Sequence, residues 1–266
     1  MIDKDLQHTL KARYNPEGSQ LRKMQLRMLE MLKYIDKVCT ENSIPYWLSS
    51  GTCLGAVRHE GYIPWDDDCD IEMLDNDYNR FVRIIENDTS CPYKIQTRRN
   101  DPGYFLTFGK LRDQKSEIKE GNTSDKTSYL YNGLYIDIFT MVPSNSRRLS
   151  IFISQIFFHL YIKGARLSGN LLKRIWNGLL MTGIIAPLSF INRIGANNRL
   201  RHKNPGGFPW ERLKSDIFPI KRIKFEDANL CVPNNCDNYL KRIYGNYMDL
   251  PDLNKISKHT AELKIW

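Results

Sequence analysis

The 266-residue chain has no uninterrupted apolar stretch long enough to cross a membrane. Its longest nearly apolar run, Leu179 to Ile191, covers 13 residues and contains Gly183 and Pro187. A spanning helix needs about 20 apolar residues. The opening segment, Met1 to Asp5, also lacks the apolar core of a secretory signal. We therefore expect neither a transmembrane helix nor a signal peptide.

The sequence also contains no Cys-x-x-Cys pair among its six cysteines. In a chain without a signal, this usage indicates reduced thiols and a cytoplasmic location. Cys231 and Cys236 alone supply too few ligands for a structural zinc site. No internal repeat or low-complexity tract is visible, which excludes a solenoid.

Acidic residues are scarce in one long segment of a chain whose net charge is +9. Between Ser144 and Arg222 stand 14 Lys and Arg but only two acids, Glu211 and Asp216. Such a segment attracts anionic lipid, polyanionic glycan or nucleic acid. A merely solvated basic face is the alternative.

The hydrophobic pattern predicts an α/β (α+β) fold with a mixed sheet flanked by helices, in a single domain over residues 1–266. Apolar residues at helical spacing predict helices, and short aromatic or β-branched runs predict strands. The expected helices are Leu21–Cys39, Cys53–His59, Tyr78–Asn87 and Asp237–Tyr244. The expected strands are Tyr46–Leu48, Ile71–Met73, Tyr93–Thr97, Leu106–Arg112 and Leu134–Phe139.

Two segments interrupt this pattern. Lys119 to Ser128 is polar and is predicted to be a loop. Residues 145–205 are predicted to form a helical basic insertion, with two helices in Leu149–Leu200 that separate near Gly169, followed by a basic, Gly-rich passage from Arg199 to Gly207.

The acidic cluster Asp66-Asp67-Asp68-Cys69-Asp70 carries the clearest chemical signal. Side chains alternate faces along a strand, so Asp68 and Asp70 are expected to point the same way. Neighbouring carboxylates repel unless a cation lies between them, and oxygen ligands favour Mg²⁺ or Mn²⁺. Mg²⁺ is usually held by one or two carboxylates plus substrate phosphates. The cluster therefore predicts a metal site that takes a phosphate-bearing substrate.

Asp137 is the candidate for a third carboxylate in this site. It lies in the run Leu134 to Phe139, where a charged residue is costly unless it is paired or metal-bound. A solvated Asp at the end of a strand is the alternative.

The small turn Ser49-Ser50-Gly51-Thr52 precedes the cluster. Between a strand and a helix, the backbone N–H groups of Ser50, Gly51 and Thr52 are suited to binding phosphate, although Ser and Thr are also ordinary helix caps.

Several basic residues are further candidates for substrate binding. Arg58 and its neighbour His59 are candidates to reach phosphate oxygens, with plain surface charge as the alternative. Lys110 and Arg112 share one face of a predicted strand and suit the neutralisation of a diphosphate.

A calcium loop and a solvated turn fit the acidic cluster less well than a metal site for phosphate chemistry. An EF-hand loop that began at Asp66 would require Gly where Ile71 stands and Glu where Asp77 stands. A solvated turn is disfavoured by the apolar residues Ile63-Pro64-Trp65 on one side and Ile71 on the other.

The block YWLSSGTCLGAVRHEGYIPWDDDCDI, residues 46–71, resembles the signature of the LicD family, relatives of fukutin and the fukutin-related protein. Lys110–Asp113, Gly133–Phe139 and Tyr239–Met248 also fit this resemblance, which spans residues 20–260. Cys69 and Ser50 depart from the residues commonest at their positions.

The resemblance implies a nucleotidyltransferase-type fold. It also implies transfer of a phospho-alcohol, such as phosphocholine, from a CDP-alcohol (CDP-choline or similar) to a glycan or lipid-linked glycan acceptor, with release of CMP. By position, Asp68, Asp70 and Asp137 match the catalytic metal ligands, and Asp66 matches an additional acid of the site. The family implies work on surface polysaccharide, lipopolysaccharide or teichoic acid, and no nucleic acid partner is expected.

Two alternative functions stay open: a nucleotidyltransferase that releases pyrophosphate from an NTP, and a non-catalytic membrane adaptor. If choline is the cargo, Tyr62, Trp65, Tyr104 and Tyr131 are candidates for an aromatic cage, although each also suits a core position. The basic insertion joins apolar helices to cations, which predicts either peripheral contact with an anionic membrane, at the inner face of the cytoplasmic membrane, or a cap over the core.

Overall fold

The computed structural model describes residues 2–101, 103–104, 106–120, 129–165, 167–203, 211–256 and 260–266. The helices are α1 (Lys4–Tyr14), α2 (Gln20–Glu41), α3 (Ser50–His59), α4 (Asp75–Asn87), α5 (Arg147–Ala165), α6 (Asn170–Leu179), the π-helix η2 (Leu180–Ile185), α7 (Ala186–Ile191), α8 (Lys214–Ile217) and α9 (Cys236–Tyr244). The strands are β1 (Tyr46–Leu48), β2 (Asp70–Leu74), β3 (Tyr93–Gln96), β4 (Gly109–Asp113), β5 (Ser116–Glu120), β6 (Tyr135–Ser144), β7 (Arg199–His202), β8 (Arg212–Leu213), β9 (Lys221–Phe225), β10 (Ala228–Val232) and β11 (Thr260–Ile265).

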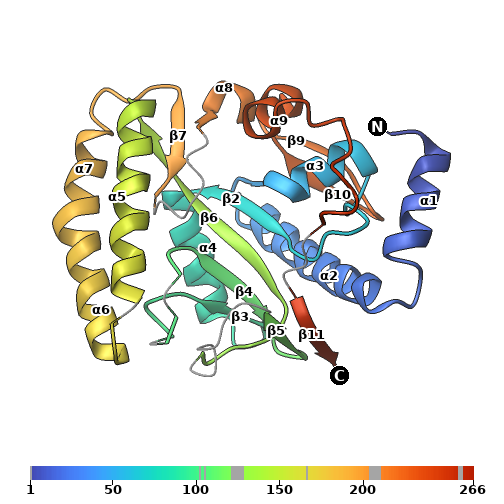
Figure 1. Ribbon diagram of the computed structural model, residues 1–266, viewed down its shortest axis with the longest axis horizontal. Helices are drawn as coiled ribbons and strands as arrows, with labels where there is room; N and C mark the ends of the chain where they lie inside the picture. The colour runs from blue at the N-terminus through green and yellow to red at the C-terminus, as the bar shows by residue number, and fades with distance from the viewer. Residues whose placement is uncertain are drawn as a thin grey trace.

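The main sheet is mixed, as the sequence predicts. Its strands follow the order β1-β2-β6-β4-β3, and β7 and β8 extend it beside the far half of β6. Strands β2 and β6 run parallel, and the other pairings in this sheet are antiparallel. In the view of Figure 1, α4 lies behind the sheet, α3 and α9 lie above β2, and α5, α6 and α7 stand at the end opposite to α1.

One face of the sheet packs into the hydrophobic core. Leu111, Ile136 and Ile138 are fully buried in the same cluster as the apolar stripe of α2, which includes Met28 and Leu32. Each such side chain contributes about 1.5–3 kcal/mol on burial. Because side chains alternate along a strand, this burial directs Lys110 and Asp137 to the opposite face.

Several elements were not predicted. They include helix α1 and the two-stranded sheets β9–β10 and β11–β5. These elements are short or polar, so tertiary contacts rather than hydrophobic periodicity specify them. The prediction of a loop over Lys119–Ser128 is wrong at its start, because β5 continues to Glu120. Residues 121–128 lie outside the described residues. Of the passage Arg199–Gly207, residues 199–202 form β7 and residues 204–207 are not described.

The basic insertion forms two helical arms, as predicted. The break between them lies near Gly169, whose φ of 81° is in the left-handed region. Its second arm corrects one expectation. Leu171 to Ile191 is a 21-residue helical stretch that is long and apolar enough, by length and composition, to cross a membrane. The apolar run Leu179–Ile191 is shorter than this helical stretch, because the helix also includes the residues before Leu179, among them the polar Lys173 and Arg174. All six cysteines are free, as predicted.

Candidate active site

Strand pairing brings Asp70 and Asp137 together from distant parts of the sequence. The two residues are register partners on the parallel strands β2 and β6. The backbone N–H of Asp137 donates to the carbonyl oxygen of Cys69 at 2.9 Å. Lys110 on β4 is the register partner of Asp137 on its other side. Three strands thus place two acids and a cation on one sheet face, away from the core.

The acidic cluster presents alternate carboxylates. Asp66, Asp68 and Asp70 are partly exposed, whereas Asp67 and Cys69 between them are buried. This alternation is the one predicted for Asp68 and Asp70, although β2 itself begins only at Asp70.

Electrostatic repulsion within the cluster is visible in its pKa shifts. Burial raises the pKa of Asp66, and the charge of Asp68 raises it further. Burial also raises the pKa of Asp70, with further contributions from Asp68 and Asp137. The pKa of Asp137 is raised by burial, against the opposing effect of Lys110. The site therefore holds more negative charge than its own residues neutralise.

The turn before α3 is attached directly to the acidic cluster. The backbone N–H of Ser49 donates to the carbonyl oxygen of Asp70 at 3.0 Å, and the N–H of Asp70 donates to Oγ1 of Thr52 at 2.9 Å. A Cβ atom at Gly51 would lie 3.0 Å from Oδ2 of Asp66, tighter than most contacts. Ser50 has a positive φ of 45°. The first turn of α3, with its N–H groups free of intrahelical bonds, therefore opens beside the carboxylates.

Lys110 is the cation nearest to the acids. Its Nζ lies 2.6 Å from Oδ1 of Asp137 and 3.2 Å from the centre of the Tyr135 ring. Burial lowers the pKa of Lys110 to about 8, although Asp137 opposes this shift. An ammonium so enclosed is weakly hydrated, which strengthens its attraction for an incoming anion.

Arg112 is held in a more structural role than the sequence suggests. Its Nε donates to Gln96 at 2.7 Å and its Nη1 donates to the carbonyl oxygen of Gly133 at 2.8 Å. The guanidinium also lies over Tyr135, at 4.7 Å from the ring centre. Arg112 therefore supports the ring against which Lys110 packs.

Arg58 links the site to the C-terminal segment. Its Nη1 donates to the carbonyl oxygens of Tyr247 and Asp249 at 2.8 and 3.0 Å, and its Nε donates to Nε2 of His59. Burial lowers the pKa of Arg58, and Tyr244 and then the charge of Asp66 oppose that shift. These hydrogen bonds hold the guanidinium in a fixed position within electrostatic range of Asp66.

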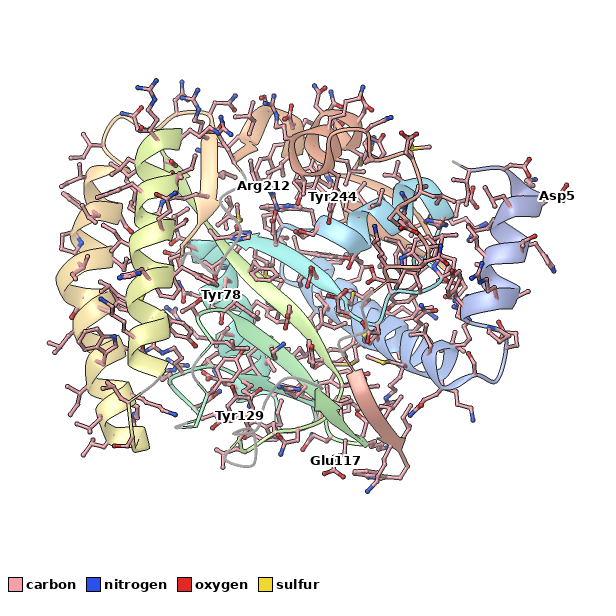
Figure 2. All side chains as sticks on the ribbon, in the orientation of Figure 1. Asp5, Tyr78, Glu117, Tyr129, Arg212 and Tyr244 are labelled. Carbon is pink, nitrogen blue, oxygen red and sulfur yellow. The ribbon has the colours of Figure 1, made fainter. Side chains whose placement is uncertain are left out.

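Two residues near the acids were not among the sequence candidates. Tyr244, the last residue of α9, is 44% exposed. Its pKa is raised by burial and then by the charges of Asp70 and Asp66, which places its hydroxyl within electrostatic range of the acids. In the view of Figure 2, Tyr244 and Arg212 both lie above β2. No periodicity marked Tyr244, because its position depends on how α9 packs against α3.

Glu72, the second such residue, lies two positions beyond Asp70 and is fully buried. It accepts hydrogen bonds from Trp47 Nε1 at 2.7 Å and Ser49 Oγ at 2.9 Å, and it pairs with Arg212 at 2.9 Å. Burial alone would raise its pKa, but Arg212 and then His202 lower it below the ordinary value. This buried network holds Ser49, and with it the start of α3, against β2.

Three of the four aromatic candidates are buried and do not line an open cage, whereas the fourth, Tyr131, is partly exposed. Tyr62 and Tyr104 are each 2% exposed, and Trp65 is 9% exposed. Tyr62 packs edge-on against Phe225, and the hydroxyl of Tyr104 donates to the carbonyl oxygen of Phe108. They are core residues, which is the alternative that the sequence left open for them.

The donor chemistry of the site fits a hard divalent cation. Asp66, Asp68, Asp70 and Asp137 offer carboxylate oxygens, the ligands that Mg²⁺ and Mn²⁺ prefer. Across the described ranges, no group of three or more His, Cys, Asp and Glu side chains is gathered closely enough to hold a metal by itself. That arrangement suits a cation bound by one or two carboxylates together with substrate phosphates.

Comparison with known proteins agrees with this geometry. The LicD/FKTN/FKRP nucleotidyltransferase domain matches residues 43–159, from the strand before α3 to the helix after β6. The matched residues, somewhat less than half of the chain, are therefore similar to the LicD-family domain. The match contains the acidic cluster, the Ser49–Thr52 turn, Lys110 and Asp137.

The similarity to a curated LicD protein extends beyond that domain. The chain is 27% identical over 248 residues to the lipopolysaccharide cholinephosphotransferase LicD of Haemophilus influenzae, covering 87% of this chain and 92% of that protein. It is 29% identical over 104 residues to the human ribitol-5-phosphate transferase FKTN, covering 39% of this chain and 22% of that protein. An uncharacterized Rickettsia typhi protein, RT0683, is 40% identical over 74 residues, covering 28% of this chain and 24% of that protein.

Proposed function

We propose that this protein transfers a phospho-alcohol, such as phosphocholine or ribitol phosphate, from its CDP-activated form to a glycan hydroxyl and releases CMP. One observation carries the proposal: the acids of β2 and β6 lie beside the N-terminus of α3 and the buried cation Lys110. Anions favour a helix N-terminus, and a diphosphate needs neutralisation at both phosphorus atoms. The names of the relatives support transfer of a phospho-alcohol in particular.

In the proposed reaction, the acceptor hydroxyl attacks the phosphorus that bears the alcohol, in line with the bond to CMP. The new P–O bond forms as the bond to CMP breaks. The N–H groups of Ser50, Gly51 and Thr52 would hold the phosphates, and Lys110 would neutralise the leaving charge. A carboxylate whose pKa is raised, such as Asp137, is suited to accept the proton of the acceptor hydroxyl.

A divalent cation belongs to this proposal. Asp68, Asp70 and Asp137 are the proposed ligands, and one or two of them together with the substrate phosphates would hold Mg²⁺ or Mn²⁺. The cation would polarise the phosphate and stabilise the departing CMP. Such a cation would also offset the burial, and then the repulsion by neighbouring carboxylates, that raise the pKa values of Asp70 and Asp137.

The acceptor and the compartment are also proposals. A glycan or lipid-linked glycan of a surface polysaccharide, lipopolysaccharide or teichoic acid is the proposed acceptor class, and the cytoplasm is the proposed compartment. The cholinephosphotransferase relative supports the first of these by its name, since it is described as acting on lipopolysaccharide.

The released nucleotide tests the proposed function. The purified chain is incubated with Mn²⁺, a glycan acceptor, and a panel of CDP-alcohols and NTPs. CMP released only when an acceptor is present would support the proposal. Release of pyrophosphate from an NTP would contradict the proposal and indicate that the protein is a nucleotidyltransferase. If no product forms with any donor although acceptors are supplied, the protein is a non-catalytic adaptor. Asp237→Asn, at an exposed acid far along the chain, serves as the matched control for Asp68→Asn.

A further inference from the structure

The basic insertion forms a helical hairpin that has its own small core. Its first arm is α5, and its second arm is the continuous helix α6–η2–α7. Ile153 and Phe157 of the first arm pack on Leu180 and Ile185 of the second, in a cluster separate from the main core. Figure 1 shows the second arm as the outermost layer at one end of the molecule. The hairpin therefore does not cap the core of the catalytic domain.

The π-helix keeps one face of the second arm turned inward from Asn177 to Asn192. The buried positions Asn177, Leu180, Ile185, Ser189 and Asn192 are separated by three to five residues. The five-residue step from Leu180 to Ile185 coincides with η2, whose wider turn accommodates one extra residue. The opposite face of this part of the second arm is therefore presented outward.

That outward face is apolar where a solvated helix carries polar residues. Leu171 is 70% exposed, Leu179 is 64% exposed and Phe190 is 68% exposed. Leu172, Ile191 and Ile194 are also more than half exposed. A contiguous apolar patch of this kind on a folded protein marks an interaction surface.

Charge identifies the kind of partner. No Asp or Glu occurs between Asp137 and Glu211 in the sequence, whereas ten Lys and Arg do. The side chains of Arg147, Arg148, Lys163 and Arg174 are exposed, and in the part of the chain that the structure describes none of the four pairs with a carboxylate. Arg147 and Arg148 lie at one end of the hairpin, and Lys163 and Arg174 lie at the other (Figure 1). Exposed cations thus occupy both ends of the hairpin that carries the apolar face.

We propose that the outward face of this hairpin binds the surface of an anionic lipid bilayer. The apolar side chains would enter the boundary between headgroups and acyl chains, and the flanking cations would contact lipid phosphates. A protein partner would need a surface as long as the hairpin that is both acidic and apolar. An anionic bilayer offers negative charge and apolar acyl chains over its whole surface. Insertion across the bilayer is disfavoured because Lys173 and Arg174 lie within the 21-residue stretch and Asn192 of the inner face hydrogen-bonds Ser144 and Ser150.

Vesicle co-sedimentation of the full chain tests this proposal without any enzymatic turnover, so its failure is distinct from a failure of the proposed function. Vesicles of phosphatidylcholine alone are compared with vesicles that also contain phosphatidylglycerol, at low and high salt. We expect binding only to the anionic vesicles, and release by salt or alkaline carbonate.

Two variants and a control separate the contributions of charge and apolar surface. Changing Arg147, Arg148, Lys163 and Arg174 to Glu should weaken vesicle binding at least about tenfold, because each surface cation contributes measurably to the attraction. The control changes the same number of exposed cations elsewhere, Lys4, Lys37, Lys221 and Lys255, to Glu and should bind more strongly than the hairpin variant. Circular dichroism confirms that each variant is folded.

The apolar variant replaces Leu172, Leu179, Phe190 and Ile191 with Gln, a good helix former, and should also lose about tenfold in binding. Equal recovery in the supernatant with neutral and anionic vesicles would overturn the proposal. Extraction from the vesicles only by detergent would also overturn it, in favour of a hairpin inserted in the bilayer.

Discussion

Asp70 and Asp137 are register partners on the only two strands of the main sheet, within the described residues, that run parallel to each other. Parallel strands place equivalent ends on the same sheet edge, so the two acids meet there although one helix and three strands separate them in sequence. Burial raises the pKa of Asp70, and the charges of Asp68 and then Asp137 raise it further, because each carboxylate raises the free energy of the other's ionised form. A site built from such a pair is strained until a cation or a proton relieves it.

Replacing either acid of the Asp-x-Asp pair should abolish turnover and spare the fold. Asp68→Asn or Asp70→Asn removes a ligand charge at a polar position, so we expect activity to fall at least about 1000-fold. Without metal, loss of like-charge repulsion should leave the free energy of unfolding unchanged or raise it by about 1 kcal/mol. Turnover is measured at saturating Mg²⁺ and stability by thermal denaturation without metal. Near wild-type activity in either variant would show that the metal centre is wrongly assigned.

Asp137 should share the cation with the acids of β2. In crystals soaked with Mn²⁺, anomalous scattering should place an ion within coordination distance of the Asp137 carboxylate and of Asp68 or Asp70. Lys110→Met removes the competing partner of Asp137 and should not displace the ion. An ion bound by Asp68 and Asp70, with Asp137 directed elsewhere, would remove Asp137 from the mechanism.

The buried Glu72 should be among the most sensitive stability positions outside the apolar core. Glu72→Gln removes the carboxylate that pairs with the buried Arg212 at 2.9 Å, so the free energy of unfolding should fall by about 3–5 kcal/mol in urea titrations. The matched control is Asp237→Asn, which breaks an exposed ion pair with Lys241 and should leave the free energy of unfolding nearly unchanged. Equal losses in the two variants would contradict the role of Glu72 as an anchor for Ser49.

His59 should make the protein sensitive to acid. Its Nε2 accepts from Arg58, and its Nδ1 lies 2.6 Å from Oε1 of Gln7, so the neutral ring with a proton on Nδ1 satisfies both contacts. Burial, and then the charge of Arg58, lowers the pKa of His59 to about 3. An unfolded His has a pKa of about 6.5. Between these values only the unfolded chain binds the proton, so the free energy of unfolding falls as pH falls through this window.

The expected slope from His59 is up to about 1.4 kcal/mol per pH unit. Urea denaturation at several pH values between these limits measures it for the wild type and for His59→Gln, whose slope should be smaller. The exposed His8, changed to Gln, serves as the control and should leave the slope nearer to that of the wild type. Identical slopes for all three proteins would contradict this assignment.

Tyr244 should contact the substrate through its ring. Tyr244→Ala should raise the KM for the CDP-alcohol by about tenfold, since stacking of a base on an aromatic ring contributes about 1–3 kcal/mol. Tyr244→Phe should retain most of the affinity if the ring, rather than the hydroxyl, makes the contact. Trp266→Ala, at another exposed aromatic residue, should leave KM unchanged. A KM unaffected by Tyr244→Ala would place the substrate elsewhere.

The sequence by itself determined the local features of the protein. The apolar stripe of α2, the alternation at Asp66, Asp68 and Asp70, and the small turn at Ser49–Thr52 follow from neighbouring residues and from the period of a helix or strand. The structure confirms the mixed sheet and the two arms of the basic insertion. The family was also recognisable, because its signature is a contiguous block.

Only the tertiary structure decided what depends on contacts between distant residues. Strand register sets Asp137 beside Asp70 and gives Lys110 its partner, and helix packing brings Tyr244 to the acids. Arg112, a substrate candidate in the sequence, is tied to Gln96 and Gly133 by hydrogen bonds that no local pattern encodes. The outward direction of Leu171 and Phe190 likewise depends on which face of the second arm packs on α5. Hydrophobic periodicity predicts that a helix has an apolar face. Which side of the helix is covered, and by which element, depends on the packing of the whole fold.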